Sequence, residues 1–147
     1  MGRKWTLGLA ALFAAYLSLS VLAPAATMSD AQLVTARVAA MKEDGAILRG
    51  AKSLSGDAAV KAATTILKNF TNFPSLFRPN SITPDSRATP KIWQNWADFT
   101  SRMAAEKANA QAMLTAAKAG DKKAYEAAIN ALKAPCSDCH LAYARVF

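Results

Sequence analysis

The prolines of this chain are concentrated in one stretch, and this distribution limits where helices can form. Proline lacks an amide hydrogen and clashes with the preceding helical turn, so it rarely lies inside a helix. We therefore expect an irregular connection over about residues 71–89, with helices before and after it. Phe73, Leu76 and Phe77 predict that this connection packs against the body of the domain. Four of the six prolines fall in it or directly after it: Pro74, Pro79, Pro84 and Pro90.

Apolar residues recur at helical spacing in four segments, at about residues 30–52, 57–69, 90–119 and 122–145. Because residues three or four apart share one face of a helix, each segment predicts an amphipathic helix. Few stretches alternate with the period of two that is typical of strands. The sequence therefore predicts an all-α fold, an antiparallel four-helix bundle in which the long connection joins the second and third helices.

Each predicted helix has an inner face that we expect to be buried. Alanine is frequent in these helices, and small side chains supply little bulky apolar material. We therefore expect a large group to fill the middle of the bundle. In chain order the four faces are Leu33, Arg37, Met41, Gly45 and Leu48; Val60, Ala63, Leu67 and Phe70; Ile92, Trp96, Phe99, Met103, Ala110, Met113 and Ala117; and Tyr125, Ile129, Leu132, Cys136, Cys139 and Tyr143.

Residues typical of helix ends flank these segments. Ser29 and Gln32 have the spacing of a capping box. Thr89 is a natural N-cap because Pro90 suits the first helical position. The other predicted caps are Asp57 and Asp121 at helix starts and Gly120 at a helix end.

Pro135 lies inside the last predicted helix. It removes one hydrogen bond and clashes with the carbonyl of Ala131. We expect a kink or a break near Ala134 instead of a straight helix from residue 125 to residue 143.

The chain begins with the pattern of an export signal. Arg3 and Lys4 precede an apolar run to about Ala23, and small residues follow at 23–26. This order predicts a signal peptide over residues 1–25 that is removed, leaving a single domain over 26–147 and a location in the bacterial periplasm. The alternative is a retained membrane anchor, since the run is nearly long enough to span a bilayer.

The predicted mature chain is moderately basic. Loss of Arg3 and Lys4 lowers the formal net charge from +8 to +6. Such a charge is compatible with docking to redox partner proteins with acidic surfaces, and equally with an ordinary solvated surface. We expect no nucleic-acid partner, because the basic residues are scattered and the chain is predicted to be exported. We expect no membrane association once the signal is removed.

The segment Cys136-Ser137-Asp138-Cys139-His140 has the C-x-x-C-H pattern of covalent haem attachment. Two thiols three residues apart on a helix can form thioethers with the two vinyl groups of one porphyrin. The adjacent His140 can then reach the iron as its proximal ligand. These are both cysteines and the only histidine of the chain. We therefore predict one haem c, with its iron, as the cofactor.

Three other interpretations of the cysteines are weaker. Exported cysteines often form disulfides, but these two are only three positions apart and are followed at once by a histidine. A thioredoxin-like redox pair requires a βαβ context, which the sequence lacks. A zinc site requires a fourth ligand that neither cysteine nor histidine can supply.

With these features the chain resembles the cytochrome c-prime family over essentially the whole predicted mature length. The resemblance rests on the attachment motif at the end of a helical chain, with Tyr143 three residues after His140. It also rests on Arg37-Val-Ala-Ala-Met41-Lys in the first helix and on Pro90-Lys-Ile-Trp93 at the start of the third. It implies a four-helix bundle with His140 as proximal ligand and the distal face of the haem toward the first helix.

The resemblance extends to the low-spin branch of the family, in which a first-helix methionine is the sixth ligand. Met41 matches that position, and the segments 43–46 and 93–99 are also similar to this branch. A thioether is a suitable iron ligand and raises the reduction potential. Alternatively, Met41 is ordinary core filler. Met103 and Met113 are weaker candidates for the same role.

The resemblance also suggests further residues around the haem. Arg37 is expected either to contact a haem propionate or to extend to water. Trp93 and Trp96 are expected to line the haem pocket or to belong to the core, and Tyr143 to pack on the proximal side. One departure is that the basic residue common four positions after the histidine is replaced by Ala144, with Arg145 next.

These features lead to three hypotheses for function. The first is a single-electron carrier, because a His140/Met41 pair closes both axial positions. The alternative is a five-coordinate haem that binds nitric oxide or another diatomic gas, as in high-spin members of the family. An enzyme such as a peroxidase is the weakest hypothesis, because there is no distal histidine, and we expect no enzymatic activity. Related bundles often form homodimers, which is possible here too.

Overall fold

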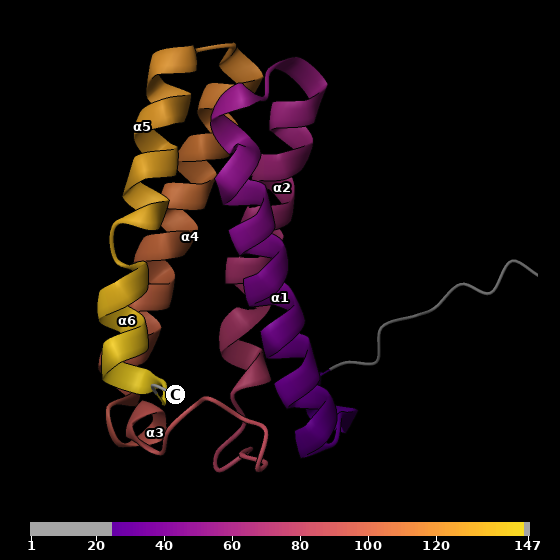
Figure 1. The fold of residues 1–147 in the computed structure, drawn as a ribbon, viewed down its shortest axis with the longest axis vertical. Helices are drawn as coiled ribbons and strands as arrows, with labels where there is room; N and C mark the ends of the chain where they lie inside the picture. The colour runs from indigo at the N-terminus through magenta and orange to yellow at the C-terminus, as the bar shows by residue number, and fades with distance from the viewer. Residues whose placement is uncertain (1–24, 146–147) are drawn as a thin grey trace, which may run out of the picture.

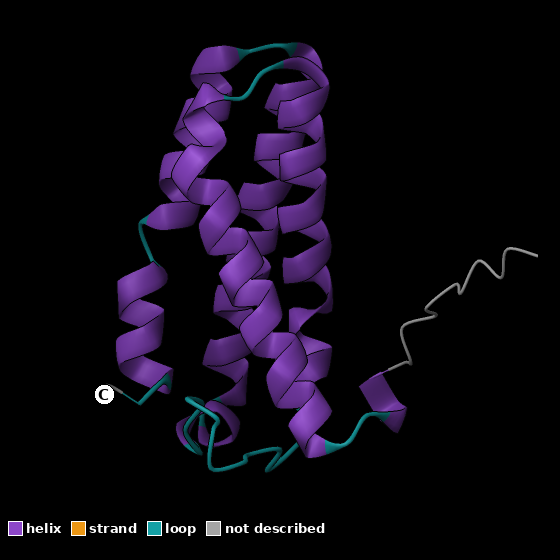
Figure 2. Cartoon of the chain, turned by 45° about the vertical axis from the view of Figure 1, so that its right-hand side comes forward, coloured by secondary structure: helices purple, strands orange, loops and turns teal. Residues whose placement is uncertain are grey.

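The computed structural model describes residues 25–145, so residues 1–24 of the predicted signal peptide lie outside the described residues. Within the described part the chain is helical and forms no β-strand, apart from an isolated bridge between Ala88 and Ala144 (Figures 1 and 2). The α-helices are α1 (Asp30–Gly50), α2 (Gly56–Asn72), α3 (Lys91–Gln94), α4 (Trp96–Ala119), α5 (Lys122–Lys133) and α6 (Cys136–Tyr143), and short 3-10 turns are η1 (Ala25–Thr27), η2 (Ala51–Ser53) and η3 (Phe73–Leu76).

The long helices form an antiparallel four-helix bundle, which confirms the predicted fold class. Helix α4 packs against both α2 and α5, whereas α1 packs against α2, η2 and η3. Helix α6 follows α5 in the same direction but is set off from it, and it packs against α3 (Figure 2). The bundle is therefore closely packed around α4, while the α1 and α6 sides stand further apart.

Several predicted caps are confirmed. The amide of Gln32 donates to Ser29 Oγ at 3.2 Å and the amide of Ser29 donates to Gln32 Oε1 at 2.7 Å, which completes the capping box. Helix α4 ends at Gly120, whose φ of 67° is a left-handed conformation that glycine adopts without strain. Asp121 caps α5 by accepting from the amide of Ala124 at 2.9 Å.

The start of α2 differs from the prediction. The helix begins at Gly56, so Ser55 holds the N-cap position and Asp57 lies inside the first turn. Gly56 has a φ of 54°, and its freedom to adopt this conformation allows the helix to begin one residue early. Asp57 still faces the positive end of the helix dipole. The helix also continues three residues past the predicted end at residue 69.

The third predicted helix is divided in two at Asn95, which has φ −124° and ψ 44°. Asn95 donates from Nδ2 to the carbonyl of Lys91 at 3.2 Å, and such local bonds compete with helical ones. Thr89 is not the N-cap, since Pro90 occupies that position and the Thr89 hydroxyl donates to the carbonyl of Tyr143. As a result of the break, Trp96 is 38% exposed instead of lying on the inner face.

The break predicted near Ala134 is confirmed. Helix α5 ends at Lys133 and α6 begins at Cys136, with Pro135 in the N-cap position of α6. The carbonyl of Pro135 accepts from the amide of Cys139 at 3.0 Å. Pro135 thus ends one helix and starts the next.

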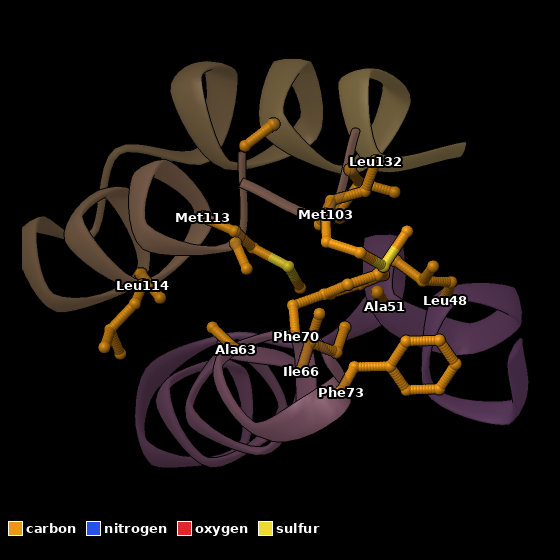
Figure 3. Close-up of a cluster of buried hydrophobic side chains, with 14 of the residues drawn as sticks. Leu48, Ala51, Ala63, Ile66, Phe70, Phe73, Met103, Met113, Leu114 and Leu132 are labelled. Atoms are coloured by element: carbon orange, nitrogen blue, oxygen red, sulfur yellow. The ribbon is translucent and has the colours of Figure 1, made fainter. Parts of the chain in front are cut away.

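The core lies where α2, α4 and α5 meet. Large side chains such as Ile66, Met113 and Ile129 are fully buried there, beside buried alanines that let the helices approach closely. Figure 3 shows side chains of α2 and α4 meeting in this core. The long connection packs down as predicted: Phe73 and Phe77 are buried, and the Phe77 ring lies 4.8 Å from that of Phe99, centroid to centroid.

A buried carboxyl lies between α1 and α2. Asp44 is only 4% exposed, and its Oδ1 accepts from Asn69 Nδ2 at 2.8 Å. Its Oδ2 has no hydrogen-bond partner. Burial raises the pKa of Asp44 to about 6, against the opposing effect of the Asn69 hydrogen bond. The charged form of Asp44 is therefore unfavourable in the folded chain.

We predict that Asp44→Asn stabilises the protein at neutral pH. The folded carboxyl binds its proton more tightly than the unfolded one, so the free energy of unfolding falls as pH rises from about 4 to about 6 and the loss persists above that. The amide retains an acceptor for Asn69 and carries no charge. We expect a gain of up to about 3 kcal/mol at pH 7, vanishing near pH 4, in urea unfolding followed by circular dichroism.

The exposed loop variant Asp85→Asn is the matched control for the loss of one negative charge. An Asp44→Asn protein that is no more stable than the parent chain at pH 7 would contradict the prediction.

Candidate haem site

A cavity of about 380 Å³ lies between α1 on one side and α6 on the other, with α4 between them. Its wall is mainly apolar, and it is large enough for a small-molecule ligand or cofactor. The connection before α3 closes one part of it through Phe77 and residues 86–88. The less closely packed side of the bundle is thus the side that contains a binding space.

The attachment motif lines this cavity. Cys136, Cys139 and His140 all contribute to its wall from α6, and the two cysteines are free thiols. Cys136 donates from Sγ to the carbonyl of Leu132 at 3.4 Å. Cys136 is exposed, contrary to the expected buried face, and Cys139 is half-buried. Desolvation of the two sulfurs at the cavity wall raises the pKa of both thiols, so the protonated form is favoured. Among residues 25–145, no group of three or more His, Cys, Asp or Glu side chains is placed to hold a metal ion.

Two of the residues expected around a haem line the α1 side of the cavity. Met41 is half-buried there, next to Val38 and one turn after Arg37. Met103 also lines the cavity from α4, whereas Met113 lies in the core outside it. The structure thus brings a first-helix thioether and the His140 imidazole to the same space, from opposite helices.

Arg37 is buried and tied to the long connection. It is 4% exposed, so the alternative in which it extends to water is wrong. Its Nη1 donates to Ser81 Oγ at 3.2 Å and its Nη2 donates to the Ser81 carbonyl at 2.7 Å. The guanidinium carbon also lies 4.5 Å from the Phe77 ring centroid, a cation–π distance. Burial lowers the pKa of Arg37, and the charge of Asp30 partly opposes this.

Tyr143 lines the cavity from the end of α6 and anchors that helix to α4. Its hydroxyl donates to the Asp98 carboxylate, which raises the pKa of Tyr143. Arg102 donates from Nε to the same carboxylate at 2.7 Å. Arg102 itself lines the cavity, and its positive charge acts on Cys139. A basic group therefore reaches the α6 side from α4, although the position four after His140 is Ala144.

Of the two alternatives expected for the tryptophans, Trp93 follows the second, since it packs against the core. Trp93 is not among the residues that line the cavity, and its Nε1 donates to the carbonyl of Phe77 at 3.0 Å. It therefore supports a residue of the wall. Trp96 stacks on Phe99, with ring centroids 5.5 Å apart and planes at 26°.

The end of α6 is bound to the connection by backbone hydrogen bonds. The amide of Thr89 donates to the Tyr143 carbonyl at 2.9 Å, and the amide of Arg145 donates to the Arg87 carbonyl at 2.7 Å. These bonds surround the bridge between Ala88 and Ala144. They hold α6 in place beyond its break from α5.

Glu106 and Arg102 are among the charged residues of the cavity that were not expected from the sequence. Glu106 is 8% exposed and lies three residues after Met103, so it continues the inner face of α4. The signal was the helical register, which places residue 106 between Met103 and Ala110 on that face. The register does not reveal Arg102 in the same way, because its position depends on Asp98 and Tyr143.

Comparison with known proteins agrees with this site. Residues 26–144 match the family model described as Cytochrome C'. The chain belongs to the cytochrome c' family. It is 40% identical over 98 residues to a cytochrome c-556 of Agrobacterium tumefaciens (strain II Chrys), covering 67% of this chain and 79% of that protein.

Solved structures show the same architecture. A cytochrome c prime from Shewanella frigidimarina has a TM-score of 0.69 and 29% identity, covering 80% of this chain and 98% of that one. A ferrous variant of cytochrome c prime from Alcaligenes xylosoxidans with bound NO has a TM-score of 0.67 and 23% identity, covering 81% and 98%. The second likeness concerns the fold alone.

As a member of this family the chain is a c-type haem protein, with covalently bound haem c and its iron as cofactor. The residues present fit that group, because two free thiols and an imidazole meet at a largely apolar cavity. Within residues 25–145 no helix has the length and apolar character needed to cross a membrane.

We predict that Ser81→Ala destabilises the haem-loaded chain by about 1–3 kcal/mol, the range for a lost hydrogen bond to a buried charged group. The Arg37 guanidinium would keep only the carbonyl of residue 81 as its acceptor in this contact. The measurement is the free energy of unfolding in guanidinium chloride. Ser75→Ala is the matched control, since the Ser75 hydroxyl donates to the Asn72 carbonyl at the surface. Equal losses in the two variants would contradict the prediction.

Proposed function

We propose that Cys136 and Cys139 hold the haem through thioether bonds and that His140 is the proximal iron ligand. The support is their position on one short helix whose residues line the cavity. Because Pro135 starts α6 afresh, the two thiols and the imidazole belong to a single rigid turn. This arrangement fixes the direction from which the imidazole approaches the ring.

We further propose that this haem binds a small diatomic gas, nitric oxide in the first place, on its α1 side. The observation that carries this function is the composition of that side: Val34, Val38 and Met41 form most of its wall, Arg37 is engaged by Ser81, and Lys42 is the other charged residue of α1 there. An apolar distal wall with few available hydrogen-bond donors favours gas binding over oxygen activation. The fold shared with the NO-bound cytochrome c prime adds support, and the comparisons favour gas binding over the electron carrier that the sequence led us to expect.

Electron transfer is the second candidate, and Met41 is the observation that favours it. Its thioether lies on the α1 side of the cavity, where a sixth ligand would come from. Haem c supplies both one-electron exchange and an iron to which gases bind. A methionine bound there would place the chain in the low-spin branch of the family, and a gas would then have to displace it.

Two further side chains have roles in this proposal. Arg37 has five N–H donors, and those not used by Ser81 are available to a haem propionate. Tyr143 packs near the proximal side and is held by Asp98. Trp93 acts indirectly in this scheme, by fixing the carbonyl of Phe77.

Export to the periplasm, removal of residues 1–25, and the absence of enzymatic activity remain predictions. A homodimer also remains a prediction. Docking to redox partners with acidic surfaces is a further prediction, and the excess of basic residues supports it. Low ionic strength would strengthen such docking.

Covalent attachment has a direct test. We predict that the exported chain keeps its red colour through boiling in denaturant and through a denaturing gel stained for haem peroxidase activity. Replacing both cysteines, as Cys136→Ala with Cys139→Ala, abolishes the stained band, whereas Ser137→Ala between them preserves it. Colour that separates from the unaltered chain would contradict covalent attachment.

Met41→Leu distinguishes the two functions. If Met41 is a ligand, the ferric absorption spectrum of the parent chain is low-spin and the variant becomes high-spin, with nitric oxide binding faster because no thioether must leave. If the site is five-coordinate, both proteins are high-spin and both bind nitric oxide. Met103→Leu is the matched control on α4. A low-spin parent chain that neither binds nitric oxide nor gains binding in Met41→Leu would contradict the gas-binding proposal.

A further inference from the structure

Glu106 is a buried carboxyl that the proposed haem binding does not use. It projects from the inner face of α4, is 8% exposed, and lines the same cavity as the attachment motif. Its Oε2 has no hydrogen-bond partner. A buried carboxylate without compensation is costly, so such a group is normally either satisfied or neutralised by a proton.

The electrostatics place Glu106 next to the attachment motif. Its negative charge raises the pKa of both Cys136 and Cys139. Those sulfurs are the atoms to which the porphyrin would be bonded, so Glu106 is close enough to respond to a change in the charge of a bound haem. Burial raises the pKa of Glu106 itself to about 7, with a hydrogen bond from Asn109 in opposition.

Two of the arginines that line the cavity already bind other residues. Arg37 is bound to Ser81, and Arg102 is bound to Asp98. His140 would be bound to iron in the proposed site. The remaining charged groups that line the cavity or act on the attachment cysteines are Lys42 on α1, Arg87 in the connection, Lys133 on α5 and Asp98 on α4.

We propose that Glu106 is a redox-linked proton acceptor, which takes up one proton when the haem gains an electron. The electron comes from a one-electron donor and converts ferric to ferrous iron, while the proton comes from water and converts the Glu106 carboxylate to a neutral carboxyl. The physical reason is Coulombic. Reduction removes one positive charge that stabilises the carboxylate, so its proton affinity increases. Net charge in the cavity is then the same in both redox states.

This inference rests on the proposed haem attachment, but it holds for an electron carrier and for a gas-binding protein alike. Its consequence is a reduction potential that falls as pH rises around neutrality. With full coupling, the equilibrium between the two redox states changes tenfold per pH unit, which is about 59 mV for one electron. A proton that moves independently of the electron gives no such slope.

The experiment is a spectroelectrochemical titration of the haem-loaded chain between about pH 5 and about pH 9, a range that brackets the pKa of about 7. We expect a sloping potential in the parent chain. In Glu106→Gln we expect a flat potential across this range, at a value above that of the parent chain at high pH, because the negative charge is lost. Glu126→Gln on α5 is the matched control, since Glu126 does not line the cavity, and it should retain the parent slope.

A second measurement follows the protonation of the carboxyl in the parent chain directly. Its reduced-minus-oxidised infrared spectrum should contain a new carbonyl band of a protonated carboxylic acid that shifts in heavy water. The band should persist in Asp44→Asn, which removes the other buried carboxyl with a raised pKa.

The outcomes separate this inference from the proposed haem site. A Glu106→Gln protein with the parent slope, or a parent chain without the infrared band, overturns the role of Glu106 and leaves haem attachment intact. A slope retained in the variant would then belong to the haem propionates. A chain without a redox wave overturns the haem site itself, and the inference with it.

Discussion

The geometry of the site depends on the missing amide hydrogen of Pro135. A continuous helix from α5 would need a donor at this position to bond the carbonyl four residues earlier, and proline has none. The helix therefore restarts, and Pro135 becomes the acceptor for Cys139. This restart sets α6 off from α5, so that both cysteines and His140 lie along the cavity. Because α6 is set off in this way, Met103 and Glu106 on the inner face of α4 line the same cavity.

The opposite side of the cavity is fixed by an interaction between distant parts of the chain. Arg37 on α1 bonds Ser81, and its guanidinium lies over Phe77. Because the cation is buried, loss of its acceptors would leave an uncompensated charge inside the protein. The contact therefore holds the long connection against α1 at the place where the proline-rich sequence has no secondary structure of its own. Trp93 adds a second attachment through the Phe77 carbonyl.

Much of this architecture follows from local sequence rules. The capping box at Ser29, the stop at Gly120 and the break before Pro135 are set by nearby residues, and all three are confirmed. The break at Asn95 was not predictable, because asparagine is tolerated inside many helices and only its bond to Lys91 shows that it competes here. Glu106 could have been found from the helical register of α4. Arg102 could not, since its orientation depends on residues of α6 that are distant in sequence.

The hydrogen bonds at the end of α6 link this helix to residues 87–89. The backbone of α5 is interrupted before α6 at Pro135, whereas the connection binds the end of α6 through paired backbone groups. Local unfolding of proteins proceeds in contiguous cooperative units that share their contacts. We therefore expect the C-terminal helix and the segment before α3 to open together, although the whole of α3, α4 and α5 separates them along the chain. A fluctuation that loosens the proline-rich connection would therefore also loosen the turn that carries the thiols.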